Sequence, residues 1–316
     1  MKKNMQNNSK GYLELKRKVL DKNYCVKCGA CAIVCPVNKI LFLDYSIMFN
    51  KDVNCINCKL CTNVCPKIDN NFVNFSNKEK YYSAKSTRIV GQDGGLATEF
   101  LIAAIELNIV DAIIAVNKDR FWRPIPVVVN SIEDIEKCKF TKFGEVCIFC
   151  SLPKVRDKKV CIIGPPCIVN AARKLQKLKY NNIKLIVGLF CSENFEYNGL
   201  INFLRNENVA IDEIVKFKVK KGFFEVITKS GTFKFKLERL KSLVMDGCKI
   251  CQDFCALNAD VSIGSAGSED GYSTVIIRSK IGKKIFEFLI KKNRIVLNNN
   301  LDTSLIRKMI RKKSKK

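Results

Sequence analysis

Short apolar runs alternate with helical periodicity over most of the chain after residue 80. Three runs have the length of strands: residues 111–116, 159–163 and 184–190. A helix is predicted from Leu96, where apolar residues recur at helical spacing, and a second one from Cys167 to about residue 179. Residues 216–235 alternate between apolar and polar side chains around Ser230-Gly231, which predicts an antiparallel hairpin. This order of elements predicts an α+β chain whose larger part is a mixed α/β domain.

The composition is that of a globular protein with a substantial core. The chain has 316 residues, 47% of them hydrophobic and 27% charged. No apolar run is long enough to cross a bilayer, so we predict no transmembrane segment, although peripheral association with a membrane complex is compatible with this pattern. The first ten residues are polar and basic, without the apolar stretch of a secretory signal, so we expect a cytoplasmic protein.

The chain has 17 cysteines and no histidine. In a reducing cytosol such cysteines indicate metal ligation or redox chemistry rather than a disulfide framework. The absence of histidine excludes Ser-His-Asp and Cys-His catalysis, histidine-ligated zinc and haem sites, and Rieske centres. Thiolates must therefore supply the ligands of any metal.

Basic residues exceed acidic residues, and the formal net charge is +26. Such a charge attracts polyanions, but the sequence contains no recognisable nucleic-acid-binding motif, so we predict no nucleic-acid partner. Part of the excess lies in the last ten residues: Arg307, Lys308, Arg311, Lys312, Lys313, Lys315 and Lys316. This tail is either solvated or a docking element for a redox partner with an acidic surface.

An internal repeat of 30 residues carries the strongest chemical signal. Each copy reads C-x₂-C-x₂-C-x₃-C-P, the spacing of bacterial ferredoxins that hold two 4Fe–4S clusters. In such motifs the fourth cysteine binds the other cluster. One cluster is therefore assigned to Cys25, Cys28, Cys31 and Cys65, and the second to Cys55, Cys58, Cys61 and Cys35.

A pair of zinc knuckles is the alternative for this repeat, but zinc ribbons use two separated C-x₂-C pairs rather than three crowded ligands. We predict that residues 1–76 form an N-terminal helix and a two-cluster ferredoxin domain that conducts electrons. Polar residues 70–80 would link it to a second domain over residues 77–316.

Candidate ligands in the second domain follow predicted strands, where ligands gather in α/β sheets. Gly94 and Gly95 precede a helix, and a Gly/Ser-rich loop spans residues 264–271. Four cysteines are sufficient for a third 4Fe–4S cluster, although any of them can instead be a buried structural residue: Cys167, Cys191, Cys248 and Cys251.

Five further cysteines have no assigned role. Cys138, Cys161 and Cys255 are expected to be core or incidental residues. Cys147 and Cys150 form a C-x₂-C pair that is compatible with a redox pair, with part of another metal site, or with a structural role.

At these residues the chain resembles the beta subunit of coenzyme F420-reducing hydrogenase and its relatives among the F420H₂ dehydrogenases. The likeness extends over roughly residues 81–289, and residues 247–274 carry its most specific stretch. Shorter matching stretches are Gly94-Gly95-Leu96-Ala97-Thr98, Thr141-Lys142-Phe143, Gly164-Pro165-Pro166-Cys167 and residues 188–195. The N-terminal ferredoxin module makes the chain more similar to the dehydrogenase than to the hydrogenase. Cys255, which closely follows the C-x₂-C segment, leaves a different choice of ligand open.

The resemblance implies bound FAD, a pocket for the deazaflavin coenzyme F420 as substrate, and a 4Fe–4S cluster beside the flavin, three clusters in all. It assigns FAD phosphate or ribityl contacts to Gly94, Gly95 and Thr98. Lys142 would face the flavin or an anionic group of the coenzyme. The flavin or deazaflavin pocket would be lined by Gly264, Ser265, Gly267, Ser268 and Ser273.

The expected enzyme transfers a hydride between F420 and FAD and passes single electrons through the clusters to or from a partner protein or complex. No catalytic side chain is required, because FAD carries the chemistry. Two alternatives remain: a ferredoxin-dependent flavin reductase of another organic substrate, and an electron-transfer protein without its own reaction.

Overall fold

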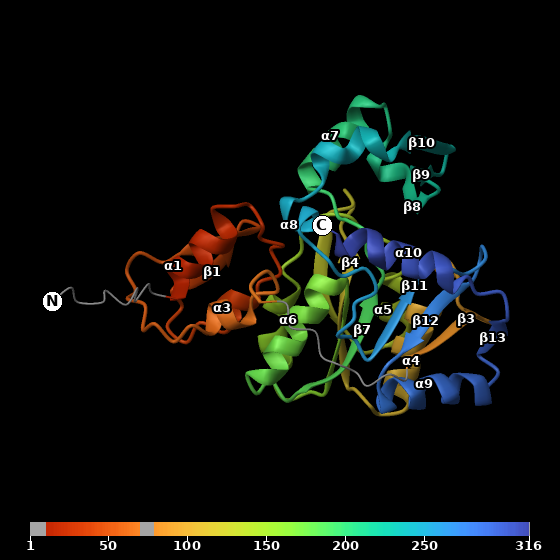
Figure 1. The fold of residues 1–316 in the computed structure, drawn as a ribbon, viewed down its shortest axis with the longest axis horizontal. Helices are drawn as coiled ribbons and strands as arrows, with labels where there is room; N and C mark the ends of the chain where they lie inside the picture. Colours follow the sequence, from red (N-terminus) through yellow and green to blue (C-terminus); the bar gives the residue numbers. More distant parts are fainter. Residues whose placement is uncertain (1–10, 70–78, 316) are drawn as a thin grey trace.

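An eight-stranded sheet forms the centre of the molecule, and four consecutive strands of it, the fourth to the seventh in the order given below, are parallel (Figure 1). The computed structural model describes residues 11–69 and 79–315, so most of the linker predicted at residues 70–80 lies outside the described residues. The strand order is β13-β3-β12-β11-β7-β6-β4-β5. The strands are β3 (Lys80–Ser86), β4 (Ala112–Lys118), β5 (Pro124–Val129), β6 (Val160–Gly164), β7 (Ile183–Leu189), β11 (Val261–Gly264), β12 (Ser273–Ile277) and β13 (Ile295–Asn298).

Helices cover both faces of this sheet. One face carries α4 (Leu96–Glu106), α5 (Ile132–Lys137) and α9 (Lys280–Lys291), and the other carries α6 (Pro166–Lys177) and the 3₁₀ segment η2 (Ile148–Val155). Because successive residues of a strand face opposite sides, Ile113 and Cys161 pack under α4 and α9, whereas Ile114 and Ile162 pack toward α6. Burial on both faces explains why β4, β6 and β7 are largely apolar runs in the sequence.

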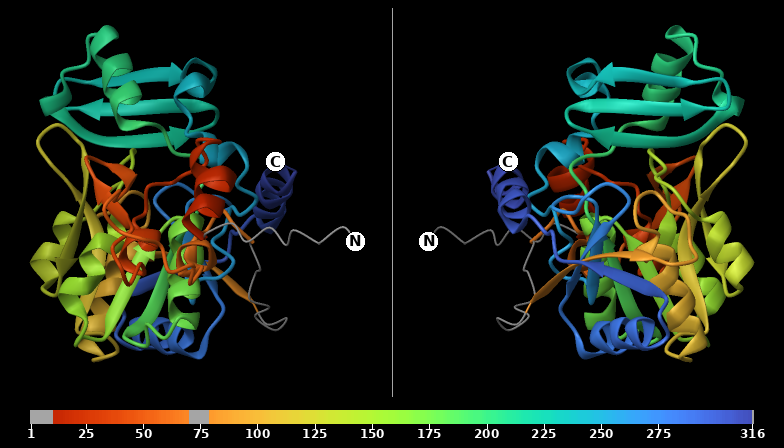
Figure 2. Two further views of the ribbon diagram at one scale, coloured as in Figure 1. Left: turned by 90° about the vertical axis from the view of Figure 1, so that its left-hand side faces the viewer. Right: turned by 90° about the vertical axis from the view of Figure 1, so that its right-hand side faces the viewer.

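A three-stranded antiparallel sheet rises from one end of the main sheet (Figure 2). It consists of β8 (Ile214–Lys220), β9 (Phe223–Thr228) and β10 (Thr232–Lys236), packed with α7 (Tyr197–Asn206), η3 (Ile211–Glu213) and η4 (Leu237–Leu243). The prediction of a single hairpin over residues 216–235 was therefore incomplete. A second turn, at Lys221-Gly222, makes three strands of this segment instead of two. Gly222 has φ +83°, which makes that tight turn accessible.

The N-terminal unit packs against α6, to the left in Figure 1. Its elements are α1 (Gly11–Leu15), the π-helical turn η1 (Lys16–Leu20), α2 (Ala30–Ile33), the hairpin of β1 (Ile40–Leu43) and β2 (Ser46–Phe49), and α3 (Leu60–Val64). Val34 and Val64 of this unit belong to the same apolar core as Val169 and Leu175 of α6. A continuous core thus joins the N-terminal unit to the sheet.

Two helices complete the described chain. The short α8 (Asp246–Lys249) precedes β11, and α10 (Thr303–Ser314) is the last helix. Among residues 11–69 and 79–315, no helix is both long and apolar enough to span a membrane.

Gly188 in β7 is a position where packing excludes any side chain. A Cβ there would lie 2.4 Å from Cβ of Ala256 and 2.8 Å from Cβ of Ala259, neither of which can rotate away. We predict that Gly188→Ala lowers the free energy of unfolding by about 1–3 kcal/mol, as overpacked cores do. Denaturant unfolding measures this change.

Gly199→Ala in α7 is the matched control. Its Cβ would meet the flexible end of Leu243 at 3.1 Å, and alanine favours a helix, so stability should change little or rise. Equal losses in both variants would contradict the packing argument.

Candidate functional site

The two cysteine motifs of the N-terminal unit fold in the same way. Lys27 and Asn57, each two residues after the first cysteine of a motif, adopt φ of 55° and 57°. Their backbone N–H groups donate hydrogen bonds to Sγ of Cys25 and of Cys55, both at 3.4 Å. Each motif then enters a short helix, α2 or α3, through a left-handed N-cap. The sequence repeat is therefore a repeat of structure.

Four cysteines line one small internal cavity and form what we call the inner thiol group: Cys25, Cys28, Cys31 and Cys65. Burial raises the pKa of Cys65 to about 11, and the nearby thiol of Cys25 adds to the shift. Cys65 comes from the second motif, so the structure places the fourth cysteine of that motif with the first three of the other.

The fourth cysteine of the first motif lies in turn with the first three of the second motif. We call this set, Cys35, Cys55, Cys58 and Cys61, the outer thiol group. Burial raises the pKa of Cys61 to about 11, and the thiols of Cys58, Cys35 and Cys55 contribute in the same direction. Cys58 is exposed, whereas three members of the inner group are buried. The outer group is thus the one that reaches the molecular surface.

A third set, the sheet thiol group, gathers at the carboxyl ends of two parallel strands. Cys167 opens α6 after β6, Cys191 follows β7, and Cys248 and Cys251 belong to the α8 segment. Burial raises the pKa of Cys191, and the thiols of Cys248, Cys167 and Cys251 raise it further. These cysteines are far apart in sequence, and the structure brings them together.

The three thiol groups are contiguous. Burial raises the pKa of Cys167 to about 12, and Cys28 of the inner group is near enough to add to this shift. Cys61 of the outer group likewise adds to the raised pKa of Cys31. A Cβ on Gly247 would lie 2.5 Å from the carbonyl oxygen of Tyr24, so glycine allows the sheet and inner groups to approach. The order is sheet group, inner group, outer group.

The donor sets fit iron–sulfur clusters better than a single metal ion. Within the described ranges, no three His, Cys, Asp or Glu side chains converge closely enough to hold one ion. A 4Fe–4S cluster is larger, and each of its four thiolates binds a different iron. Four cysteines without histidine or carboxylate, as in each thiol group, are the usual ligands of such a cluster.

Lysines lie beside these thiols: Lys67 and Lys174 are half-buried, and Lys313 is buried. Lys67 donates a hydrogen bond to the carbonyl of Gly247 at 2.6 Å, and Lys174 donates one to the carbonyl of Cys65 at 2.7 Å. Lys313 donates to the carbonyl of Cys191 at 2.7 Å and also to that of Ser192. Its side chain is 4% exposed, so the interpretation of the basic tail as solvated is wrong for Lys313, which α10 directs inward. The positive charge of Lys313 also opposes the raised pKa of Cys191.

The glycines predicted to contact FAD lie where the start of α4 meets the sheet. The N–H of Gly94 donates to Oγ of Ser273 at 3.0 Å, and a Cβ on Gly94 would lie 2.6 Å from the carbonyl oxygen of Ala84. Gly95 is the left-handed N-cap of α4, and Thr98 is buried in its first turn. Close packing thus accounts for glycine here, and Gly94 and Ser273 of the predicted set are neighbours.

The Gly/Ser-rich loop is held by α10 and by its own side chains. A Cβ on Gly267 would meet the carbonyl oxygen of Asp302 at 2.8 Å, and one on Gly264 would overlap the ring of Phe190. The hydroxyls of Ser268 and Thr274 lie 2.8 Å apart. Ser265 is exposed. The groups of this loop that are available to a ligand are therefore backbone atoms and the hydroxyl of Ser265, rather than a set of side chains.

Lys142 follows α5 and is largely buried. Its ammonium donates to the carbonyls of Cys138 at 2.5 Å and Lys139 at 2.6 Å. Burial lowers the pKa of Lys142 to about 8. The cation is thus fixed by the end of its own helix.

A row of lysines on β8 was missed in the reading of the sequence. Lys216, Lys218 and Lys220 alternate along the strand and therefore share one face. Burial raises the pKa of Asp93, which lies between Gln92 and Gly94, and the charges of these three lysines oppose that shift. The row thus faces the glycine segment before α4. The K-x-K-x-K pattern within a predicted strand was the signal that could have revealed it.

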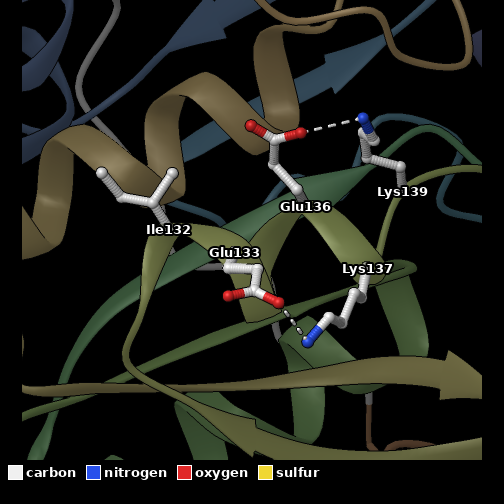
Figure 3. A pocket seen from close by; sticks show the side chains of 5 residues that line it. All are labelled: Ile132, Glu133, Glu136, Lys137 and Lys139. Carbon is white, nitrogen blue, oxygen red and sulfur yellow. Dashed lines mark hydrogen bonds and ion pairs between the residues drawn. The ribbon is translucent and has the colours of Figure 1, made fainter.

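A surface hollow of about 640 Å³ lies elsewhere, over α5 (Figure 3). Its lining residues belong to α5 and the positions beside it, and the four charged ones pair with one another. Glu133 contacts Lys137 at 2.9 Å, and Glu136 contacts Lys139 at 3.0 Å, at the exposed helix surface. Exposed pairs of this kind are worth little and offer no unpaired recognition group, so we assign no function to this hollow.

The cysteines outside the three thiol groups fall into two classes. Cys161 and Cys255 are fully buried in apolar cores, in agreement with the prediction, and Cys138 is half-buried after α5. The charged neighbours of Cys255 are Arg278, Asp253 and Glu79, not the sheet thiols. Cys147 and Cys150 instead form a disulfide.

Three family models match successive parts of the chain. Residues 17–66 match a 4Fe–4S dicluster domain. Residues 81–152 and 157–302 match the N-terminal and C-terminal parts of the coenzyme F420 hydrogenase/dehydrogenase beta subunit. The first match contains both motifs of the N-terminal unit, and the last contains the whole sheet thiol group.

Relatives with related names extend over most of the chain. The coenzyme F420-dependent sulfite reductase of Methanocaldococcus jannaschii is 33% identical over 94% of this chain, but the chain spans only 50% of that protein. A component of the F(420)H(2) dehydrogenase of Methanosarcina mazei is 29% identical over 94% of this chain and 91% of its own length. The beta subunit of the coenzyme F420 hydrogenase of Methanothermobacter thermautotrophicus is 34% identical over 65% of this chain and 79% of its own length.

A solved structure shares the fold of the larger part. It is a chain of the F420-reducing [NiFe] hydrogenase complex from Methanosarcina barkeri, with a TM-score of 0.72 and 30% identity, covering 78% of this chain and 92% of that one. Together with the matches to both halves of the family model, this likeness shows that the chain belongs to the family of coenzyme F420 hydrogenase/dehydrogenase beta subunits, joined here to an N-terminal 4Fe–4S dicluster domain.

Proposed function

We propose that this protein is an iron–sulfur flavoprotein that transfers a hydride between coenzyme F420 and FAD and exchanges single electrons with a partner protein. The observation that carries the proposal is the contiguous order of the three thiol groups. The sheet group lies in the part that matches the F420 beta subunit, and the outer group reaches the surface. Three clusters in this order would form one path between substrate and partner.

FAD, when bound, would join two-electron hydride chemistry to the one-electron chemistry of the clusters. The chain offers an anion-binding region for its diphosphate between the lysine row of β8 and the start of α4. Lys216 and Lys218 supply positive charge close to Asp93. α4 begins at Leu96, after the N-cap Gly95, which makes no side-chain cap hydrogen bond, so the first N–H groups of the helix have no acceptor within it. Asp93 is half-buried, and these lysines offset the effect of its burial only in part, so an anionic group would compete with it for their charge.

We assign the residues that the resemblance names to contacts around this region. Gly94, Gly95 and Thr98 would contact FAD through backbone or hydroxyl groups. Lys142 would add a fixed positive charge. The pocket for the flavin or deazaflavin ring would include backbone of the loop with Gly264, Ser265, Gly267 and Ser268, next to Ser273.

The half-buried Lys67 and the buried Lys313 support the presence of anionic groups at the thiols. A 4Fe–4S cluster with four thiolates carries net negative charge, which burial disfavours unless cations or N–H donors compensate. Lys67 lies near both the inner and sheet groups, because its charge acts on Cys25, Cys65, Cys167 and Cys248. Lys313 acts on Cys191 and Cys248. These cations would compensate the negative charge of clusters in the protein interior.

The surface near the outer group fits a docking site for the partner. Ile56, next to Cys55, is 59% exposed, and Met48 in β2 is 49% exposed. Apolar side chains beside an exposed ligand are suited to a transient complex that brings a second redox centre close. The net charge of +26 favours an acidic partner and also raises the capture rate of the anionic coenzyme.

The decisive experiment is an anaerobic assay with the full chain. After reconstitution with iron, sulfide and FAD, we expect F420H₂ to be oxidised when a viologen is the acceptor, seen as the return of the visible absorption of oxidised F420. Omission of FAD should abolish this oxidation. Absence of oxidation by protein with full iron and flavin content would favour a ferredoxin-driven reductase of another substrate, and absence of flavin binding would favour an electron-transfer protein without its own reaction.

Cys251→Ala tests the third cluster. If the sheet thiol group holds a 4Fe–4S cluster, this variant should lose about four of about twelve irons per chain after reconstitution. Cys255→Ala is the matched control, four residues away but surrounded by Arg278, Asp253 and Glu79 instead of thiols, and should keep all its iron. Unchanged iron in Cys251→Ala, or loss in Cys255→Ala, would refute the ligand assignment.

Lys313→Met tests the buried cation of α10. It leaves the carbonyls of Cys191 and Ser192 without a donor, so the free energy of unfolding should fall by about 1–3 kcal/mol. Loss of a positive charge should also make the sheet cluster harder to reduce, which an EPR-monitored redox titration measures. Lys312→Met, at an exposed position of the same helix, should change neither quantity, and an equal effect in both variants would exclude a specific role of Lys313.

A further inference from the structure

The Cys147–Cys150 disulfide lies directly against the loop of the inner thiol group. The N–H of Phe149, between the two cysteines, donates a hydrogen bond to the carbonyl of Cys28 at 3.1 Å. Lys27 and Glu145 form an ion pair at 3.0 Å on the same contact. A segment more than 100 residues distant in sequence is thus fixed on the backbone of a cysteine of the inner group.

Gly29 shows how close this approach is. A Cβ on Gly29 would lie 2.3 Å from Sγ of Cys147 and 2.9 Å from Sγ of Cys150. Both sulfurs therefore occupy the space that any other residue would fill between Cys28 and the start of α2. Gly29 also has φ +82°, so glycine satisfies two separate requirements here.

The pair has the geometry and exposure of a redox-active dithiol. The Cα atoms are 5.5 Å apart, within the range that a disulfide spans. Cys147 is 7% exposed, whereas Cys150 is half-buried. Cys147 is thus shielded beside the inner group, and Cys150 is the more accessible of the two to a reactant from outside.

A purely structural disulfide is a weaker explanation. A bond across only two intervening residues closes a small ring and constrains the unfolded chain little. The η2 segment is already held by the apolar core through Ile148, Phe149 and Leu152, which are 1% exposed or less. The bond therefore adds little stability that the core does not already provide.

We propose that Cys147 and Cys150 are a dithiol/disulfide couple that takes electrons from the 4Fe–4S cluster of the inner thiol group and delivers them through Cys150 to a disulfide substrate. The cysteines of the inner thiol group would hold a cluster that supplies electrons one at a time and is re-reduced by a one-electron donor. The S–S bond of Cys147 and Cys150 would take up two such electrons in succession, together with two protons from solvent, and become two thiols. The thiolate of Cys150 then attacks the substrate disulfide and releases one substrate thiol, and Cys147 attacks the mixed disulfide, releases the second thiol and restores the Cys147–Cys150 bond.

This inference rests on the 4Fe–4S dicluster domain and is independent of F420 and FAD. The test therefore uses reduced methyl viologen as the sole electron donor and the reconstituted full chain without flavin. In an anaerobic titration, the wild-type protein should accept two more electrons per chain than the Cys147→Ser/Cys150→Ser double variant, because a disulfide is a two-electron couple. Iron content and the EPR signal of the reduced clusters show whether the double variant keeps its clusters.

Two further readouts complete the test. Differential alkylation with mass spectrometry should find Cys147 and Cys150 blocked in the oxidised protein and alkylated after reduction by viologen. Hydroxyethyl disulfide should then reoxidise reduced viologen catalytically with the wild-type protein, and the rate should fall at least tenfold in the double variant. Cys138→Ser, which removes a half-buried thiol outside the three groups, should behave as wild type in all three measurements.

The contrary results are equally clear. Equal electron counts in wild type and double variant, or alkylation of both cysteines in the oxidised protein, would overturn the redox couple. A disulfide that stays intact after the clusters are reduced would identify a structural bond. Reduction of the pair without turnover of hydroxyethyl disulfide would overturn the assignment of a disulfide substrate.

Discussion

The packing of the N-terminal unit against α6 is the constraint on which the functional arrangement depends. Electrons can pass between redox centres only when these lie close together, yet the thiols of the sheet group and the inner group belong to separately matched parts of the chain. A continuous apolar core with Val64 on one side and Leu175 on the other holds the two parts in contact. Hydrophobic burial has no directionality, so the hydrogen bonds of Lys67 and Lys174 across this contact fix its register.

Charge compensation is the second requirement, and it explains part of the basic composition. Most of the excess positive charge lies at the surface, where it acts on encounter with anions and partners. Lys67, Lys174 and Lys313 have a different role: they donate hydrogen bonds to backbone carbonyls beside the thiol groups. An ammonium held in this way satisfies its hydrogen bonds and still adds positive potential at the thiolates. The net charge of the chain alone does not distinguish these two uses.

The sequence was sufficient wherever the arrangement of residues depends on local spacing. The 30-residue repeat predicted the exchange of Cys35 and Cys65 between motifs, and the structure places them in those groups. Strands β4, β6 and β7 and the helices after Gly95 and Pro165 also agree with the prediction, because apolar runs and helix starts are local signals. The second turn at Lys221-Gly222 was missed because its lysine is a weak turn signal.

Long-range contacts were beyond prediction from residue patterns. The burial of Lys313 depends on where α10 docks, and a basic tail gives no local indication of that. The contact between Gly29 and Cys147 likewise joins two loops that are unrelated in sequence, so the C-x₂-C pair remained open to several roles. Lys216 and its neighbours on β8 carried a readable alternation, but their meaning required the position of Asp93.

The unequal exposure of the thiol groups has a consequence for how the protein is damaged by air. Susceptibility of sulfur ligands to oxidation follows their access to solvent. Cys58 is exposed, whereas Cys28, Cys31 and Cys65 are buried, so oxygen should disassemble the centre at the surface first and reach the interior last. A briefly aerated molecule would then keep its interior clusters but lose electron transfer to its partner. Inactivation would therefore begin with the loss of electron exchange at the surface, before the reaction in the interior is lost.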